Sequence, residues 1–449
     1  MFRTYIAFLA VLGLLSTGCA MSTGGNDNSN SDAAGGSSGT GGDAQGGTMP
    51  SDPDPMGGAV VPPMGGTAEP PMGGTPDPGP GDGAVEISDV LTRLANDLVL
   101  PTFVQFAEKS AALETSVGEW AASPTNSELR EAAREAWVEA TFTWQHAELM
   151  QLGPVGASGK RLAGDDLRDR IYSWPATRTC RIDQTLLSAE FNEADWLDGA
   201  LFEVQGLDAL EYVLYSETLE NACPGAVRIN RDGLWASEFP DLDSLTARRA
   251  EFAAVVAGGV RVAADEVVTA FSADGGNFAG ALAAGTAPYA DAKNGLNEVY
   301  AALFYVDKLI KDAKLGRPLG IAEGCDEDRC PEAFESRYSG RGAAHLLANL
   351  DSFEAMFFGT IDGEEGPGFD DLLQNNDGAV VVSRMAENIA AARSAIEALG
   401  NDLPTALTDN ASGVEAAHSA IKSVTDDFKG GVVTILDLEV PREGSGDSD

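Results

Sequence analysis

The sequence has 449 residues, and its 70 acidic and 29 basic side chains give a formal net charge of −41. A surface this acidic repels nucleic acid and anionic lipid, so nucleic acid is excluded as a partner, and cations gather near the protein instead. Solubility alone would also explain the charge, so the charge suits a metal-binding role without establishing one.

Residues 1–18 form a predicted export signal, with a basic start, an apolar run from residue 5 to 15 and small residues before Cys19. The run is too short for a membrane span. A small residue and a glycine before a cysteine are typical of a bacterial lipoprotein signal, although Ser16 stands where leucine is usual. We therefore expect Cys19 to be lipidated and to anchor the chain to a bacterial membrane, with the outer membrane favoured. A secreted protein that loses Cys19 with its leader is the alternative.

Residues 19–84 are rich in Gly, Pro, Ser and Asp, and the run Pro-Pro-Met-Gly-Gly-Thr occurs at both Pro62 and Pro70. No apolar periodicity here could build a core, so we predict a disordered linker. A flexible chain of this length has a root-mean-square reach of roughly 45 Å. Such a tether would hold the folded domain, in the periplasm or at the cell surface, away from the membrane.

Helical periodicity dominates the rest of the chain, and no convincing strand alternation occurs, so the fold class is predicted to be all-α. Pro101 is the expected place for a kink, and Gly153-Pro154 ends a helix. Helices are expected at about 87–120, 127–151, 181–191, 206–215, 243–272, 287–313, 341–358, 379–399 and 412–428. We predict one domain, 85–440, made of two packed helical bundles at about 85–238 and 239–440.

Four cysteines remain besides Cys19, and an even number in an exported chain indicates disulfides. The expected pairs are Cys180–Cys223 and Cys325–Cys330, each within one half of the domain. A zinc site is the alternative, but no histidine lies near these cysteines in the sequence.

The stretch from Gly206 to Tyr215 carries the chemistry most open to interpretation. Read as a helix, it places Asp208 and Glu211 on one face, beside a stripe of leucines that would bury it. Buried carboxylates need a cation, an arginine or a shared proton to compensate for lost solvation. The simpler interpretation is a helix edge with two solvated acids.

This stretch resembles the Gly-x-His-x-x-Glu signature of the imelysin family of bacterial envelope proteins, with Asp208 in the histidine position. Four further segments agree with the family pattern in order: Trp144–Glu148 leading into Gly153-Pro154, Tyr172–Pro175, Lys314–Gly320 and Glu335–Arg341. The resemblance implies a duplicated pair of four-helix bundles with a pocket between them. The site residues it suggests are Glu148, Asp208 and Glu211 as metal ligands, and Trp144, Ser336 and Arg341 as ligand-binding neighbours.

The expected cofactor is a divalent or ferric metal ion, whose identity the sequence leaves open. Imidazole favours zinc, copper or iron, whereas an all-oxygen shell that includes Asp208 favours calcium, magnesium, manganese or ferric iron. His146 and His345 are the candidates to restore a nitrogen ligand. Arg341 offers a competing account, because an arginine can neutralise the same acids without any metal.

Three functions follow from this interpretation. The first is an envelope lipoprotein that binds iron or another metal, or a metal-bearing ligand, for delivery to uptake partner proteins. The second is a metal-dependent peptidase, but the zincin pattern of two histidines one helical turn apart is absent, and so is the motif histidine. The third is a non-catalytic scaffold with a decayed site.

The lipid anchor can be tested directly. Cys19→Ser removes the thiol that would carry the lipid, so the variant should move from the membrane fraction to the soluble fraction on cell fractionation. Finding the unsubstituted protein only in the soluble fraction would refute the anchor.

Overall fold

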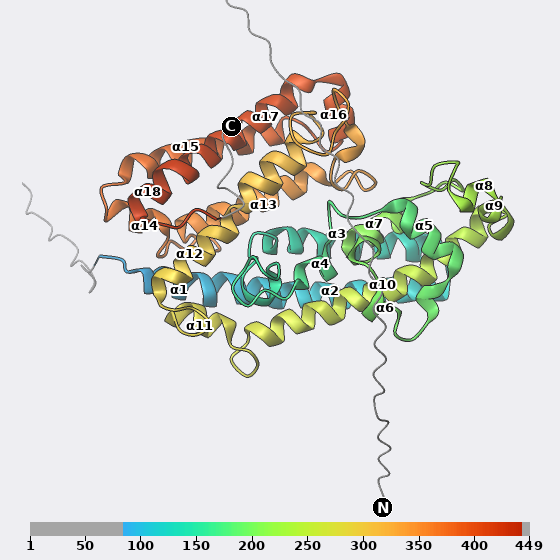
Figure 1. Cartoon of the computed structure of the whole chain (residues 1–449), viewed down its shortest axis with the longest axis horizontal. Helices are drawn as coiled ribbons and strands as arrows, with labels where there is room; N and C mark the ends of the chain where they lie inside the picture. The colour runs from blue at the N-terminus through green and yellow to red at the C-terminus, as the bar shows by residue number, and fades with distance from the viewer. Residues whose placement is uncertain (1–83, 442–449) are drawn as a thin grey trace, which may run out of the picture. The chain divides into compact units, whose positions relative to one another are not determined.

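The computed structural model describes residues 84–441, and Figure 1 shows them as an all-helical domain. Within this range the backbone forms helices, turns and one isolated β-bridge, between Ile361 and Glu364. The predicted all-α fold with packed helical bundles is confirmed. The expected export signal, Cys19 and the linker up to residue 83 lie outside the described residues. No helix between residues 84 and 441 is long and apolar enough to cross a membrane.

The first bundle is built on α2 (Leu100–Ala122), α3 (Ser127–Ala147), α7 (Gly206–Tyr215) and α10 (Leu242–Phe271). In it α10 packs along α2 and α7, and α3 packs against both α2 and α7. Its connections carry the short helices α4 (Leu167–Ile171), α5 (Thr179–Ser188), α6 (Trp196–Gly199), α8 (Arg228–Arg231) and α9 (Leu234–Glu238), with 3-10 turns η2 (Gly153–Val155), η3 (Glu190–Asn192) and η4 (Phe202–Val204).

The second bundle is built on η5 (Val306–Gly316), α13 (Gly342–Phe358), α15 (Ala379–Glu397) and α17 (Ala411–Asp427). Here α17 packs against α15 and η5, and α13 packs against the same two helices. The other elements are α11 (Phe278–Ala284), α12 (Ala292–Leu303), η6 (Pro331–Ala333), α14 (Phe369–Gln374), α16 (Leu403–Asp409), η7 (Phe428–Val432) and α18 (Val433–Leu436). Helices α13, α15 and α17 follow the predicted ranges within two residues, whereas the single helix predicted at 287–313 is divided into α12 and η5.

Helix α10 bears on where the bundles divide. The predicted boundary near residue 239 assigns α10 to the second bundle, whereas α10 packs against α2, α4 and α7. Its inward face is alanine- and valine-rich, and the small side chains let the neighbouring helices approach closely. By these contacts, α10 completes the bundle that contains the signature helix α7.

The first helix is continuous from residue 87 to 122 but changes winding before Pro101. It runs as α1 (Ile87–Arg93), a π-helical turn η1 (Leu94–Val99) and then α2. Proline has no amide hydrogen to donate to the preceding turn, and its ring crowds the carbonyl four residues earlier. A widened turn ahead of the proline accommodates that crowding without ending the helix.

Helix α3 packs against α7 within the first bundle. Asn126 caps its start by accepting hydrogen bonds from the amides of Glu128 and Leu129. The buried face of α3 includes Trp137, whose Nε1 donates to the carbonyl of Leu207 at 2.7 Å. Helix α3 also packs against α13 of the second bundle. It therefore joins the signature helix to the opposite half of the domain.

Both predicted disulfides are present, which confirms the pairing. Cys180 of α5 is bonded to Cys223, and Cys325 is bonded to Cys330. The two bridges close loops of very different length, with sequence separations of 43 and 5.

The loop lengths predict unequal contributions to stability. Replacing Cys180 and Cys223 by alanine should lower the free energy of unfolding by about 4 kcal/mol, and replacing Cys325 and Cys330 by about 2 kcal/mol, because the longer loop restricts the unfolded chain more. Chemical denaturation under non-reducing conditions measures both differences. An equal loss from the two double variants would contradict this order.

Candidate functional site

The signature helix α7 is held by a close backbone approach at its first residue. Gly206 has a φ of +88°, and a Cβ atom there would lie 2.8 Å from the carbonyl oxygen of Ile171. Only glycine allows both the positive φ and this contact. The approach brings the start of α7 against the segment that follows α4, and residues 206–214 are all buried.

Asp208 is bound by donors from that segment. Its Oδ1 accepts from the amide of Ser173 at 3.1 Å, and its Oδ2 accepts from the Ser173 hydroxyl at 2.9 Å and from the Thr177 hydroxyl. Burial raises the pKa of Asp208, and these hydrogen bonds act in the opposite direction. The carboxylate therefore links α7 to residues 173–177.

Glu211, one turn later on α7, faces the second half of the chain. Its Oε1 accepts hydrogen bonds from the amides of Tyr338 at 3.0 Å and Ser339 at 2.8 Å. Burial raises the pKa of Glu211 to about 7, against the stabilising effect of these amides. The two signature acids thus bind different segments, one from each half of the domain.

Asp208 and Glu211 line the same cavity, of about 190 Å³. Ser336 lines it from the second half, as the sequence analysis expected. Its remaining wall combines aromatic, hydroxyl and guanidinium groups with one further carboxylate and small residues, from Trp174, Pro175, Thr177, Thr179, Arg317, Gly324, Glu332, Ala333, Phe334, Arg337 and Tyr338. The predicted pairing of the two acids in one pocket is what the structure shows.

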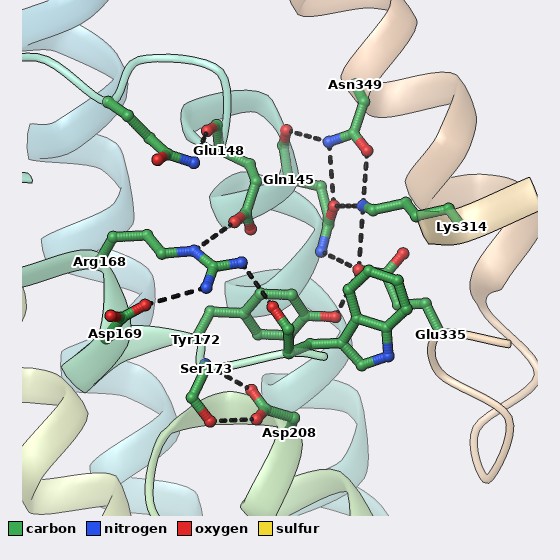
Figure 2. Close-up of polar contacts among 12 residues, drawn as sticks. Gln145, Glu148, Arg168, Asp169, Tyr172, Ser173, Asp208, Lys314, Glu335 and Asn349 are labelled. Carbon is green, nitrogen blue, oxygen red and sulfur yellow. Dashed lines mark hydrogen bonds and ion pairs between the residues drawn. The ribbon is translucent and has the colours of Figure 1, made fainter. Parts of the chain in front are cut away.

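Glu148 is placed elsewhere. It is fully buried, does not line this cavity, and forms an ion pair with Arg168 at 2.9 Å (Figure 2). Arg168 also donates to Asp169 at 3.0 Å and to the carbonyl of Trp174 at 2.7 Å. Burial raises the pKa of Glu148, and Arg168 lowers it. An arginine therefore compensates this acid, although it is Arg168 and not Arg341.

The other candidate residues lie apart from the cavity wall. Trp144 is buried in the first bundle against Phe106, with ring centroids 4.8 Å apart. Arg341 is exposed at the start of α13. His146 packs edge-on against the ring of Phe142. His345 is buried and shares a 3.0 Å hydrogen bond with the Ser336 hydroxyl through Nδ1, and burial lowers its pKa to about 4.

The largest polar assembly at the contact of the two bundles was not predicted as a site. Lys314 of η5 forms an ion pair with Glu335 at 2.9 Å and donates to Gln145 at 2.8 Å and Asn349 at 2.6 Å. Figure 2 shows Lys314 and Asn349 meeting Gln145 from the opposite half. Glu335 also accepts from Tyr172 at 2.6 Å and from Gln145 at 3.2 Å. All five side chains are buried.

The charge of Glu335 is well supported. Burial alone would raise its pKa, but the nearby ammonium of Lys314 and the hydrogen bond from Tyr172 hold it below the usual range. Four of the five residues, Gln145, Tyr172, Lys314 and Glu335, fall inside the motif segments named in the sequence analysis. The presence of these four residues in the motif segments was the sequence signal that could have indicated this assembly.

The acids do not fit the expected three-carboxylate metal shell. Between residues 84 and 441 no group of three or more His, Cys, Asp or Glu side chains is arranged to hold a metal ion. Glu148 is engaged by Arg168, and both oxygens of Asp208 already accept hydrogen bonds. A bare ion would find the two buried carboxylates and the exposed Glu332 at the cavity, which is short of the six or more oxygens that calcium or magnesium takes.

Comparison with known proteins identifies the family. The family model described as Imelysin (Peptidase_M75) matches residues 99–429. This chain belongs to the imelysin family. The match covers both bundles and every motif segment, so the resemblance carried by those motifs is confirmed.

Two solved structures share the imelysin fold with this chain. An imelysin-like protein from Psychrobacter arcticum 273-4 has a TM-score of 0.59 and 18% identity, covering 79% of this chain and 96% of its own. A protein described as an iron-regulated protein A precursor, from Parabacteroides distasonis ATCC 8503, has a TM-score of 0.59 and 17% identity, covering 78% and 95%. No curated protein matches the sequence.

The buried pair of Lys314 and Glu335 predicts a large stability effect. Lys314→Met should lower the free energy of unfolding by about 3–5 kcal/mol, because it leaves Glu335 as an uncompensated buried charge. Chemical denaturation measures the change. Adding Glu335→Gln should recover much of the loss.

A matched control is Lys109→Met, which removes the exposed pair with Glu139 and should cost no more than about 1 kcal/mol. If Lys314→Met is as stable as this control, the pair does not hold the bundles together.

Proposed function

We propose that this imelysin-family protein binds a metal ion, iron above all, that arrives with donor groups of its own, in the cavity lined by Asp208 and Glu211. The observation that carries the proposal is the wall of that cavity, where two buried carboxylates face two guanidinium groups, those of Arg317 and Arg337. A complexed metal presents a cationic centre and anionic donors together. The wall offers partners for both.

The arginines of this wall have capacity for anionic donors. Arg337 donates to the carbonyl of Glu332 at 2.7 Å and to the hydroxyl of Tyr338 at 2.7 Å. Arg317 donates to the carbonyl of Glu323 at 2.9 Å. Neither forms an ion pair with a carboxylate among the described residues. Between residues 84 and 441, the positive charge of these two arginines is therefore not engaged in an ion pair.

The carboxylates supply the opposite charge. Glu211 receives both of its backbone donors on Oε1, so Oε2 has the greater capacity to meet a ligand. Its pKa of about 7 leaves it partly ionised at neutral pH, and a nearby cation would favour the ionised form. A metal that keeps some of its own donors needs fewer ligands from the protein, which suits a site with two buried acids.

A hydrolase is the second candidate, because Ser336 lines the cavity and contacts a histidine. In a catalytic triad, however, serine and acid bind opposite nitrogens of the imidazole. Here the Ser336 hydroxyl lies 3.0 Å from Nδ1 of His345, and Oε2 of Glu335 lies 3.8 Å from the same nitrogen. A histidine with a pKa of about 4 is also a weak base at neutral pH. The geometry favours binding over hydrolysis.

The proposal includes the setting expected from the leader. A lipid on Cys19 and the long linker would hold the binding domain near a bacterial membrane, where it would pass metal to uptake proteins. The description of the Parabacteroides protein as iron-regulated is consistent with such a role.

Metal loading tests the proposal. Purified protein is incubated with ferric nitrilotriacetate, ferrous, calcium or zinc ions and desalted, and bound metal is measured by mass spectrometry. Asp208→Asn and Glu211→Gln should each weaken loading about tenfold or more, because each removes a charge from the cavity. Glu108→Gln, at an exposed acid on α2, is the matched control and should load as the wild type does.

The outcomes are distinct. Wild-type protein that loads none of these probes contradicts metal binding, and loading unchanged by both variants places the metal elsewhere. Hydrolysis in a broad peptide screen that Ser336→Ala abolishes would favour the second candidate.

A further inference from the structure

A second, larger cavity of about 590 Å³ lies between the loop after α3 and the start of η5. Phe304, Tyr305 and Leu309 provide its apolar surface, and its polar residues are Gln151, Lys160, Arg161, Lys308, Arg317 and Glu323. Its volume is within the range of small-molecule sites. Nothing described so far gives this cavity a role.

The charged lining of this cavity is mostly basic, whereas the chain as a whole is strongly acidic. Four basic side chains line the cavity and one acidic side chain does, in a protein whose net charge is −41. A concave surface of one sign focuses the electrostatic field and concentrates ions of the opposite sign. The basic residues come from separate parts of the chain, Lys160 and Arg161 from one loop and Lys308 and Arg317 from η5 and its end. The fold gathers them in one place.

Arg317 is the residue that points most directly to a ligand. Its Nε donates to the carbonyl of Glu323, and its side chain packs over Gly324, where a Cβ would lie 2.7 Å from Nε. The guanidinium is thereby held in position without a carboxylate. Burial and the positive charge of Arg178 both lower its pKa. An anion bound at this guanidinium would offset both effects.

The other basic groups are anchored around the same cavity. Arg161 donates to the carbonyl of Ala301 at 2.7 Å, and Lys308 lies 3.5 Å from both Asp307 and Asp312. Lys160 is exposed at the rim. These contacts fix where the positive charge stands, so it would not have to be reorganised on binding.

We propose that this cavity binds a small molecule carrying two or more anionic oxygens, with Arg317 as its central contact. A guanidinium presents parallel N–H donors that match a carboxylate or a phosphate. Lys160 and Arg161 supply further positive charge, whereas that of Lys308 is shared with Asp307 and Asp312, and the rings of Phe304 and Tyr305 receive the carbon skeleton. Carboxylate and phosphate share this chemistry, and the experiment separates them.

The anion cavity and the proposed metal cavity share Arg317, but residues that line only one of them separate the two proposals. Lys160 lines the 590 Å³ cavity but not the cavity of Asp208 and Glu211, whereas Arg317 lines both. Lys160→Gln therefore reports on the anion cavity alone, and Asp208→Asn reports on the metal cavity alone.

The test is isothermal titration of the full chain, free of metal, with citrate and separately with inorganic phosphate. We expect the wild type to bind one of the two anions. Its affinity should fall as sodium chloride is raised from about 20 to about 200 mM, because salt screens the attraction between the anion and the basic side chains. Arg317→Gln should weaken binding about tenfold or more, and Lys160→Gln about threefold. Arg317→Lys should retain part of the affinity, because it keeps the positive charge but loses the parallel N–H donors of the guanidinium.

Two controls make the outcome decisive. Lys109→Gln and Glu108→Gln each remove a surface charge of α2 and should bind as the wild type does. Tighter binding of citrate assigns the site to carboxylates, and tighter binding of phosphate assigns it to phosphates. Failure of the wild type to bind either anion at low salt, or equal affinity in Arg317→Gln and Lys109→Gln, overturns the proposal. Neither result affects metal loading.

Discussion

The buried ion pair of Lys314 and Glu335 is the interaction on which the rest of the site depends. Two charges removed from water are tolerable only when their hydrogen-bonding capacity is met. Here Gln145 and Asn349 accept from Lys314, and Gln145 and Tyr172 donate to Oε1 of Glu335, while its Oε2 has no hydrogen-bond partner between residues 84 and 441 and lies 3.8 Å from Nδ1 of His345. Since these groups come from both bundles, satisfying the pair fixes one half against the other. The chain runs directly from Glu335 to Ser336 and on to the amides that bind Glu211, so the same pair positions one wall of the cavity.

Most of the helices could be predicted because their signal is local. The apolar period identified α10, α13, α15 and α17 within a residue or two. The type of helical winding could not be predicted in this way. The π-helical η5 shifts the hydrogen-bond register without altering the apolar pattern, so an ordinary helix was expected there. Helix η5 carries Lys314 into the interface and ends beside Arg317, which lines both cavities.

The candidate site could be predicted in part, for a related reason. Asp208, Glu211 and Ser336 meet at one cavity, as the motifs implied. Glu148 does not line this cavity, and its carboxylate forms an ion pair with Arg168 instead. Arg168 stands in a broken stretch with no periodicity and no motif, and sequence separation carries no information on which arginine will reach a buried acid. The motif segments suggested Arg341 as the arginine that neutralises these acids, but Arg341 is exposed at the start of α13.

The aspartate in the motif's histidine position acts here as a junction. A neutral imidazole accepts one hydrogen bond, whereas a carboxylate can accept several. Asp208 accepts from the amide and hydroxyl of Ser173 and from Thr177, and Ser173 belongs to the motif segment 172–175. Its negative charge is therefore already shared among three donors. Glu211 has its donors on one oxygen and a pKa near neutrality, so it is the acid whose charge would respond most to a cation in the cavity. Asp208 therefore fixes the shape of the site, and under the proposed function Glu211 would make the stronger electrostatic contact with a cationic ligand.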